Sequence, residues 1–276
     1  MSGKYVYHSS IWKEEPEKDN PFATKTAYCH GYDVYGDVLK KASWFEYLYL
    51  MFKGDKPSVQ QAMLLEKLAI TLANPGPREA SVRAAMNGGV AGSRNAASLM
   101  AALAVGAGQY GGGHEVFIAV NAWETFGTDL NAWQQFLSNP NQGYEEDIWL
   151  PIEHAPGFEP NGESFPLTLR LTLEHLAEIS PGSALRWLLN QREALELHVG
   201  YPLAMSGIAA AAFHDLGIGS HQASMLFLML RLPGAAAHAL EQRELGWKTF
   251  PYYGDSITLK NDPGSSATPN VSEFNL

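Results

Sequence analysis

A histidine preceded by a run of glycines is the first feature of the sequence that suggests chemistry. His114 follows Gly111-Gly112-Gly113, where the absence of side chains lets the backbone approach a ligand closely. An imidazole in that place is able to donate a hydrogen bond to a ligand or to take up a proton. A partly buried structural histidine, bonded to a backbone carbonyl, is the alternative interpretation. The residues around His114 leave both open.

An arginine at the end of an apolar helical run is the second such feature. Arg231 follows the segment 223–230, which is apolar apart from Ser224. A guanidinium that projects from such a helix often binds a carboxylate through two parallel hydrogen bonds. A structural ion pair inside the chain competes with that interpretation, and the pattern is typical of both.

Other kinds of catalytic or metal site find little support in the sequence. Nine histidines are present, but none forms an H-E-x-x-H pair, and His214-Asp215 with His221 lacks an obvious third ligand. The G-x-S-x-G elbow of serine hydrolases is absent, and the glycine run lacks the Gly-Lys-Ser of a phosphate-binding loop. We therefore expect no metal and no permanently bound cofactor.

The charge balance of the 276-residue chain narrows the function further. Lys and Arg number 19 against 29 Asp and Glu, for a net charge of −10, which repels nucleic acid and anionic lipid. Cys29 is the single cysteine, so an intrachain disulfide is excluded and a reducing compartment fits best. No signal peptide and no apolar run of about 18 residues is evident. We expect a cytoplasmic protein that binds neither nucleic acid nor membrane.

Helical patterns dominate after a short amino-terminal segment of different character. Residues 1–36 are rich in Tyr, His and Gly and predict short strands and turns, an amino-terminal β arm. Ser43 and Ser58 each precede a Glu or Gln by three residues, the spacing of a capping box, so helices are expected to begin there. The class is therefore all-α. Further helices are expected near residues 167–179, 182–198, 202–216, 220–230 and 234–245.

Three other segments have distinctive compositions. Residues 80–108 are dominated by small and apolar residues, which predicts a tightly packed interior or subunit interface, and the glycine run that follows requires a special backbone path. Residues 137–166 contain five prolines and are interpreted as a long, structured loop, a kind of segment that often carries function. The polar tail after Asp255 is expected to be mobile.

Several of these segments together resemble the citrate synthase superfamily. Residues 231–242, Arg-Leu-Pro-Gly-Ala-Ala-Ala-His-Ala-Leu-Glu-Gln, resemble the carboxy-terminal signature of citrate synthases and citryl-CoA lyases. The glycine run with His114 resembles the first catalytic histidine motif of the family. The resemblance covers nearly the whole chain, whose length is closer to that of a citryl-CoA lyase. Further similar segments are residues 30–33, 43–50, 54–57, 206–207 and 213–218.

Enzymes of this family join or split a carbon–carbon bond next to a coenzyme A thioester. They use one histidine to stabilise an enol, an aspartate as base and a second histidine at the ketone oxygen. These roles exist because a weakly acidic C–H bond needs a positioned base and a developing oxyanion needs donors aimed at it. By resemblance His114 is the enol-stabilising histidine, although Glu115 replaces the glycine that usually follows it.

Other positions of the family's site are substituted. The second histidine normally closes a Pro-Gly-aromatic-Gly-His run, but residues 156–160 end in Pro160, which has no proton to donate. Leu203 stands at the aspartate position, Pro75 stands at that of a substrate-binding histidine, and residues 161–165 lack the usual basic side chains. A displaced acid or base is expected from the altered loop. The candidate catalytic residues are therefore His114, His154 and Glu159, and the candidate substrate-binding residues are Arg231, Pro156, Gly157 and Phe158.

The resemblance also implies an architecture and two rival functions. A large helical domain of residues 1–117 and 219–276 would hold an inserted smaller domain of residues 118–218, with the cleft between them. Dimers are usual in the family, and residues 95–108 are our candidate for part of the interface. The first function is a diverged enzyme acting on a CoA thioester, together with a carboxylate, without ordinary citrate synthase chemistry. The second is a non-catalytic protein that binds a CoA ester or partners an active paralogue, so a homodimer and a heteromer both remain open.

Overall fold

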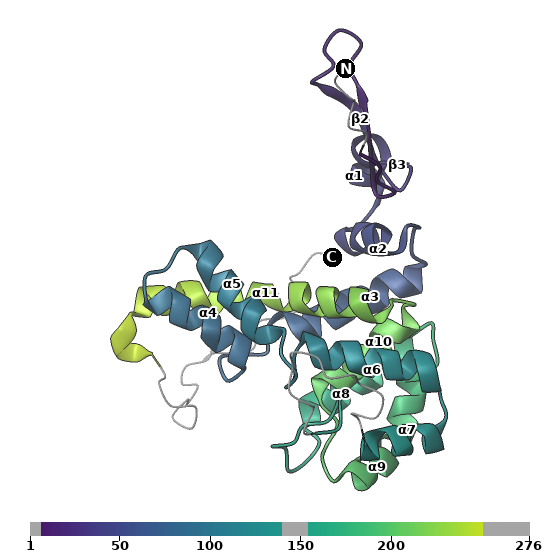
Figure 1. Cartoon of the computed structure of the whole chain (residues 1–276), viewed down its shortest axis with the longest axis vertical. Helices are drawn as coiled ribbons and strands as arrows, with labels where there is room; N and C mark the ends of the chain where they lie inside the picture. The colour runs from purple at the N-terminus through teal and green to yellow at the C-terminus, as the bar shows by residue number, and fades with distance from the viewer. Residues whose placement is uncertain (1–6, 140–153, 251–276) are drawn as a thin grey trace, which may run out of the picture.

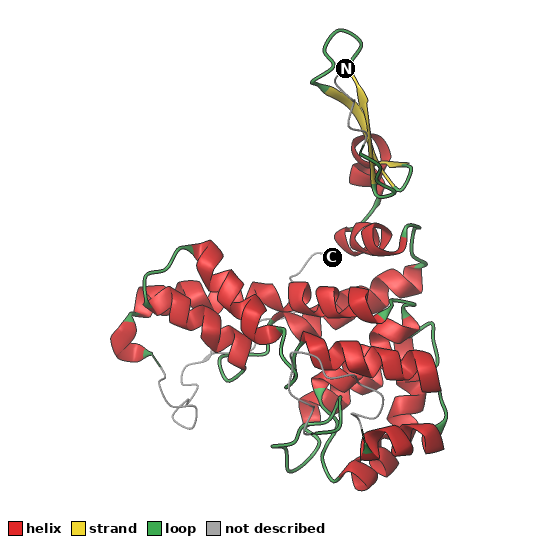
Figure 2. Cartoon of the chain, in the orientation of Figure 1, coloured by secondary structure: helices red, strands yellow, loops and turns green. Residues whose placement is uncertain are grey.

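The chain is mostly helical, with a small sheet at its amino terminus (Figure 1; Figure 2). The computed structural model describes residues 7–139 and 154–250. The predicted class, all-α with an amino-terminal β arm, is confirmed. Predictions for the first residues of the arm, for residues 140–153 of the long loop and for the tail after Asp255 lie outside the described residues.

A three-stranded antiparallel sheet forms the amino-terminal arm. Strand β1 (Trp12–Pro16) pairs with β2 (Thr24–Cys29), and β2 pairs with β3 (Tyr32–Asp33). A π-helical turn, η1 (Val34–Val38), and the short helix α1 (Leu39–Lys41) follow. Figure 1 shows that the arm extends away from the helical body, so most of its side chains remain at least partly exposed.

Two helices begin at the predicted capping boxes. Helix α2 (Trp44–Lys53) starts after Ser43, whose hydroxyl accepts the Glu46 N–H at 3.2 Å while the Glu46 carboxylate accepts the Ser43 N–H at 2.6 Å. Helix α3 (Val59–Ala73) starts in the same way after Ser58. The remaining helices are α4 (Ala80–Val90), α5 (Asn95–Gly106), α6 (Gly113–Phe126), α7 (Leu130–Ser138), α8 (Leu167–Ile179), α9 (Ala184–Val199), α10 (Met205–Asp215), α11 (Ser220–Leu245) and the 3-10 turn η2 (Trp247–Thr249).

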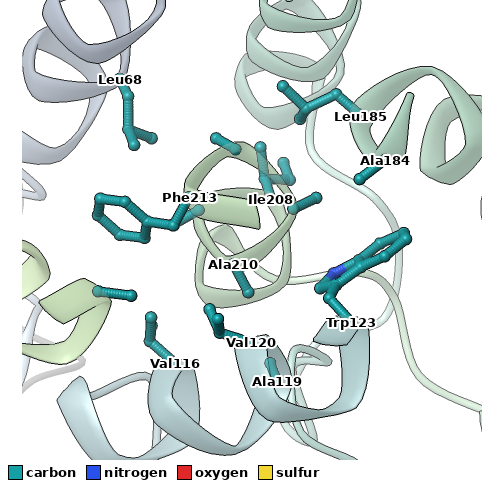
Figure 3. Close-up of a cluster of buried hydrophobic side chains, with 14 of the residues drawn as sticks. Leu68, Val116, Ala119, Val120, Trp123, Ala184, Leu185, Ile208, Ala210 and Phe213 are labelled. Atoms are coloured by element: carbon teal, nitrogen blue, oxygen red, sulfur yellow. The ribbon is translucent and has the colours of Figure 1, made fainter. Parts of the chain in front are cut away.

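Helix α10 lies at the centre of the main core (Figure 3). Its four consecutive alanines, Ala209–Ala212, are completely buried, so the neighbouring helices approach its backbone closely. Val120 and Trp123 of α6 pack on one side, and Leu68 of α3 and Leu185 of α9 pack on others (Figure 3). The small residues of α10 therefore hold the start of this helix in a fixed position relative to α6.

Helices α4, α5 and α11 pack together through small residues. Helix α5 buries Ser98, Ala102 and Gly106, which recur every fourth residue on one face. Helix α4 contacts both α5 and α11, and α11 also contacts α5. The tight packing predicted for residues 80–108 is confirmed, and its packing partners include helices of the same chain.

Helix α11 is continuous through Pro233, so the prediction of two helices, 220–230 and 234–245, was wrong. A proline inside a helix removes one hydrogen bond and clashes with an earlier carbonyl, at about 3 kcal/mol or more. Packing of α11 against α3, α4, α5 and α6 along its length offsets that cost. By length and composition alone this helix is apolar enough to cross a membrane, but a core helix has the same composition, and 44% of its most apolar window is buried inside the chain.

The two predicted domain boundaries differ in where they fall relative to the helices. The boundary at residues 117/118 falls inside α6, which packs against both α10 and α11. The boundary at residues 218/219 falls just before α11. The division itself stays a prediction.

Main-chain contacts attach the long loop to the start of α10. The Ala204 N–H donates to the Gly157 carbonyl at 2.8 Å, and the Glu159 N–H donates to the Pro202 carbonyl at 2.8 Å. Gly157 has φ of +88°, and a Cβ atom on Gly207 would lie 2.5 Å from the Gly157 oxygen. The two backbones touch here, so glycine is needed on both sides of the contact.

The Gly207→Ala substitution tests this backbone contact. Glycine to alanine usually stabilises a helix interior by about 1 kcal/mol, whereas here the added methyl should lower the free energy of unfolding by about 1–3 kcal/mol. Urea denaturation measures the difference. Gly108→Ala is the control, because its Cβ atom would meet only the Val105 oxygen at 3.4 Å, an ordinary contact. A Gly207→Ala protein as stable as the parent would contradict the contact.

Candidate functional site

A cavity of about 460 Å³ lies where six segments of the chain meet. They are the end of α3, the start of α4, the turn before α6, the long loop, the start of α10 and the middle of α11. Four of the segments that were compared with the family supply part of the wall, through Gly111, Phe158, Ser206 and Arg231. Residues far apart in the sequence therefore converge on one cavity.

Glu115 is a completely buried carboxylate in the wall of this cavity. Its Oε1 atom accepts the Gly157 N–H at 2.7 Å and the Ser206 hydroxyl at 2.6 Å. Its Oε2 atom accepts the Gly111 N–H at 2.6 Å and lies 3.3 Å from His154 Nε2. A carboxylate has about four acceptor positions, so this one is fully engaged. Such a set of partners is what a buried charge requires.

The glycine run positions one of these partners, the N–H group of Gly111. Gly111 has φ of +64°, and a Cβ atom on Gly112 would lie 2.3 Å from the Gly108 carbonyl oxygen. The run therefore folds back against the end of α5 along a path closed to residues with side chains, as the sequence predicts. This turn brings the Gly111 N–H to the carboxylate of Glu115 in the first turn of α6.

Arg231 is paired with a carboxylate of its own chain. Its Nη2 atom lies 2.8 Å from Glu79 Oε1, and its Nη1 atom donates to the Gly111 carbonyl at 2.9 Å. The guanidinium also lies over the ring of Phe227, with 4.9 Å between Cζ and the ring centroid. Burial lowers the pKa of Arg231, and the carboxylates of Glu79 and Glu115 oppose that change. The ion pair within the chain is therefore present, and ligand binding by Arg231 stays a prediction.

The predicted loop residues divide between the cavity wall and the surrounding protein. Phe158 and Glu159 line the cavity, as does Pro75. Glu159 is exposed, and its Oε1 atom accepts the Asn161 N–H at 3.1 Å. Pro156 is buried without belonging to the described wall of this cavity. Gly157 is also absent from the described wall, and its contribution to the site is the hydrogen bond that its N–H donates to Glu115.

His114 is the second residue of α6 and is half-buried. Its N–H donates to the Ala107 carbonyl at 3.1 Å, and its ring stacks on Phe117 with 6.1 Å between centroids. At this turn of α6, the described cavity wall includes the neighbouring residue Glu115 and does not include His114. The catalytic role of His114 stays a prediction.

His154 lies behind the carboxylate of Glu115 instead of on the described cavity wall. It is 6% exposed, and its ring stacks on Tyr110 with 5.1 Å between centroids. Its Nδ1 atom has no hydrogen-bond partner among the described residues. The Nε2 atom of His154 therefore contacts Glu115, and the catalytic role of His154 stays a prediction.

Sequence reasoning missed Glu115, Glu79 and Ser206 as members of the site. The signal for Glu115 was the substitution itself, because a charged residue in a position for glycine needs buried donors around it. The signal for Glu79 was its place at the start of a helix, where its Oε2 atom accepts the Val82 N–H at 3.0 Å. In residues 7–139 and 154–250, no group of three or more His, Cys, Asp or Glu side chains is placed to hold a metal ion.

Comparison with solved structures relates this architecture to known proteins. Citryl-CoA lyase from Hydrogenobacter thermophilus is 17% identical, with a TM-score of 0.64 over 96% of each chain. ATP citrate lyase from Methanothrix soehngenii, in complex with citrate and coenzyme A, is 17% identical with a TM-score of 0.70 over all of this chain. Citrate synthase from Thermoplasma acidophilum is 16% identical, with a TM-score of 0.53 over 84% of this chain and 60% of that one. The chain has a citrate synthase-like fold.

The citrate synthase-like fold confirms the fold class that the sequence resemblance implied. The chain spans 44% of the length of the ATP citrate lyase it matches and almost all of the citryl-CoA lyase. No protein-family model matches the sequence. No curated protein gives a significant match to it.

Substitutions of Glu115 test the buried network. Glu115→Ala leaves two N–H groups and a hydroxyl without their acceptor, so the free energy of unfolding should fall by at least about 3 kcal/mol, at about 1–3 kcal/mol for each unpaired group. Glu115→Gln keeps one oxygen and should cost less. Glu159→Ala is the control, an exposed carboxylate whose loss should change stability by less than about 0.5 kcal/mol. Urea denaturation that finds Glu115→Ala and Glu159→Ala equally stable would rule out the network.

Proposed function

We propose that this chain binds a coenzyme A thioester in the cavity and acts on the carbon–carbon bond next to the thioester carbonyl. The observation that carries the proposal is that four of the segments compared with the family converge on a single cavity, through Gly111, Phe158, Ser206 and Arg231. The structural likeness to a citryl-CoA lyase, and to an ATP citrate lyase that holds citrate and coenzyme A, supports the same ligand class.

The acid and base groups of the proposed reaction differ from those that the resemblance implies. Leu203, at the aspartate position, is buried and apolar, and Pro160 has no proton to give. Glu159 is a carboxylate on the cavity wall and is the candidate base that faces a ligand. His154, in contact with Glu115, is the candidate reservoir for the proton. The proposed activity is therefore not ordinary citrate formation.

A non-catalytic role is the second candidate, and the pairing of the buried charges favours it. Glu115 has its acceptor positions engaged, and Arg231 is neutralised by Glu79. Groups held in this way are suited to maintaining a binding cavity. In that case the chain binds a CoA ester without converting it, or serves as the partner of an active paralogue.

The proposal includes assembly as a homodimer, or as a heteromer with a paralogue, in the cytoplasm. Exposed apolar side chains on two packed helices support an interface: Met100 is 68% and Val105 47% exposed on α5, and Met225 is 62% exposed on α11. Light scattering at several concentrations should give the mass of two chains. A monomer at every concentration would exclude the homodimer.

Binding of acetyl-CoA to the parent protein and to His114→Ala tests the ligand class and the role of His114. The parent should bind the ester, and the variant should bind it up to about tenfold more weakly, because one hydrogen bond contributes about 0.5–1.5 kcal/mol. His175→Ala, an exposed histidine on α8, is the matched control. For all three proteins, calorimetry measures the affinity for acetyl-CoA and a thermal melt measures the stability. Unchanged affinity with lowered stability would assign His114 a structural role, and absence of binding to the parent would defeat the proposed function.

The parent protein is expected to lack citrate synthase turnover. A general base and a general acid each contribute about 10²–10⁴-fold, and neither family group is present at its position. Thiol release from acetyl-CoA and oxaloacetate is the measurement. A rate in the common enzyme range of about 1–10³ per second would contradict the proposal.

A further inference from the structure

We infer that the cavity takes an uncharged acyl group, because carboxylates of the chain already engage Arg231 and the three donors that surround Glu115. The inference rests on the proposed CoA thioester function and adds the chemical class of the acyl group. It replaces the carboxylate that the sequence resemblance implies as a second ligand. Two separate groups of contacts lead to it.

The first group surrounds Arg231. A guanidinium in a cavity wall is a natural partner for a ligand carboxylate, but here Glu79 lies 2.8 Å from its Nη2 atom. Glu79 is itself fixed as the N-cap of α4, since its Oε2 atom accepts the Val82 N–H at 3.0 Å. A ligand carboxylate at Arg231 would therefore have to displace a carboxylate that also accepts hydrogen bonds from the Val82 N–H and the Ser81 hydroxyl.

The second group surrounds Glu115. The N–H groups of Gly111 and Gly157 and the hydroxyl of Ser206 converge on its carboxylate at 2.6–2.7 Å. Three converging donors of this kind would otherwise suit an anionic ligand. Because Glu115 is completely buried and bonded to all three, the place of a ligand anion is filled by the chain.

The composition of the cavity wall also favours an uncharged acyl group. The described wall includes three acidic residues, Glu79, Glu115 and Glu159, and two arginines, Arg78 and Arg231, so its formal charge is negative. A ligand carboxylate would be repelled by that negative charge. The apolar side chains in the wall, which include Leu72, Phe158, Met205 and Phe227, fit an uncharged carbon chain instead.

Butyryl-CoA and succinyl-CoA form a matched pair of probes for the parent protein. Both carry a four-carbon acyl group, and they differ in whether the terminal carbon is a methyl or a carboxylate. Calorimetry should find that butyryl-CoA binds at least roughly tenfold more tightly. Equal or tighter binding of succinyl-CoA would overturn the inference while leaving the thioester function intact. Failure of both esters and of free CoA to bind would instead defeat the proposed function, and the inference with it.

Glu79→Gln identifies the contact that causes the discrimination. This substitution keeps an oxygen for the cap of α4 but removes the charge paired with Arg231, so succinyl-CoA should gain roughly tenfold relative to butyryl-CoA. Glu163→Gln, at an exposed carboxylate of the same loop outside the described wall, removes one negative charge without touching Arg231 and should change the ratio by less than about threefold. Equal gains in the two variants would overturn the role assigned to the Glu79–Arg231 pair. Circular dichroism and a thermal melt establish that each variant is folded, and the comparison of the two esters on the parent protein holds without them.

Discussion

The carboxylate of Glu115 is the constraint on which the site depends. A buried charge is tolerated only where donors surround it, and here the donors come from three different segments. One is the glycine turn before α6, one is the long loop, and one is the start of α10. Satisfying this charge therefore fixes the relative positions of the segments that build the cavity. Polar networks of this kind favour one arrangement, because partial satisfaction is worse than none.

Helix α11 connects this network to the rest of the molecule. Arg231 contacts the same glycine turn through the Gly111 carbonyl and reaches α4 through Glu79. The Gly111 N–H donates to the Glu115 carboxylate, and the Gly111 carbonyl accepts from the Arg231 guanidinium, so one residue bonds to both buried side chains. The two charged groups are linked through this one residue, so a change at either is expected to affect the other.

The parts of the fold that the sequence predicts are those with local causes. The capping boxes at Ser43 and Ser58 involve residues three positions apart, and the backbone path of the glycine run follows from its missing side chains. The continuity of α11 through Pro233 was not predictable in this way, because distant helices offset a local penalty. The pairing of Arg231 with Glu79 and the partners of Glu115 are equally non-local. The sequence shows the charged residues, while only the folded chain shows which groups face them.

The contact between the long loop and α10 has a consequence for how this site is able to change over evolution. Gly157 and Gly207 touch through backbone atoms, and two further main-chain hydrogen bonds join the same segments. Backbone groups are common to nearly every residue type, so most substitutions in the loop leave its position unaltered. Side chains such as Glu159 and Pro160 can then be exchanged, which alters the cavity wall while the loop backbone keeps its position. A scaffold fastened in this way permits new ligand chemistry without a new fold.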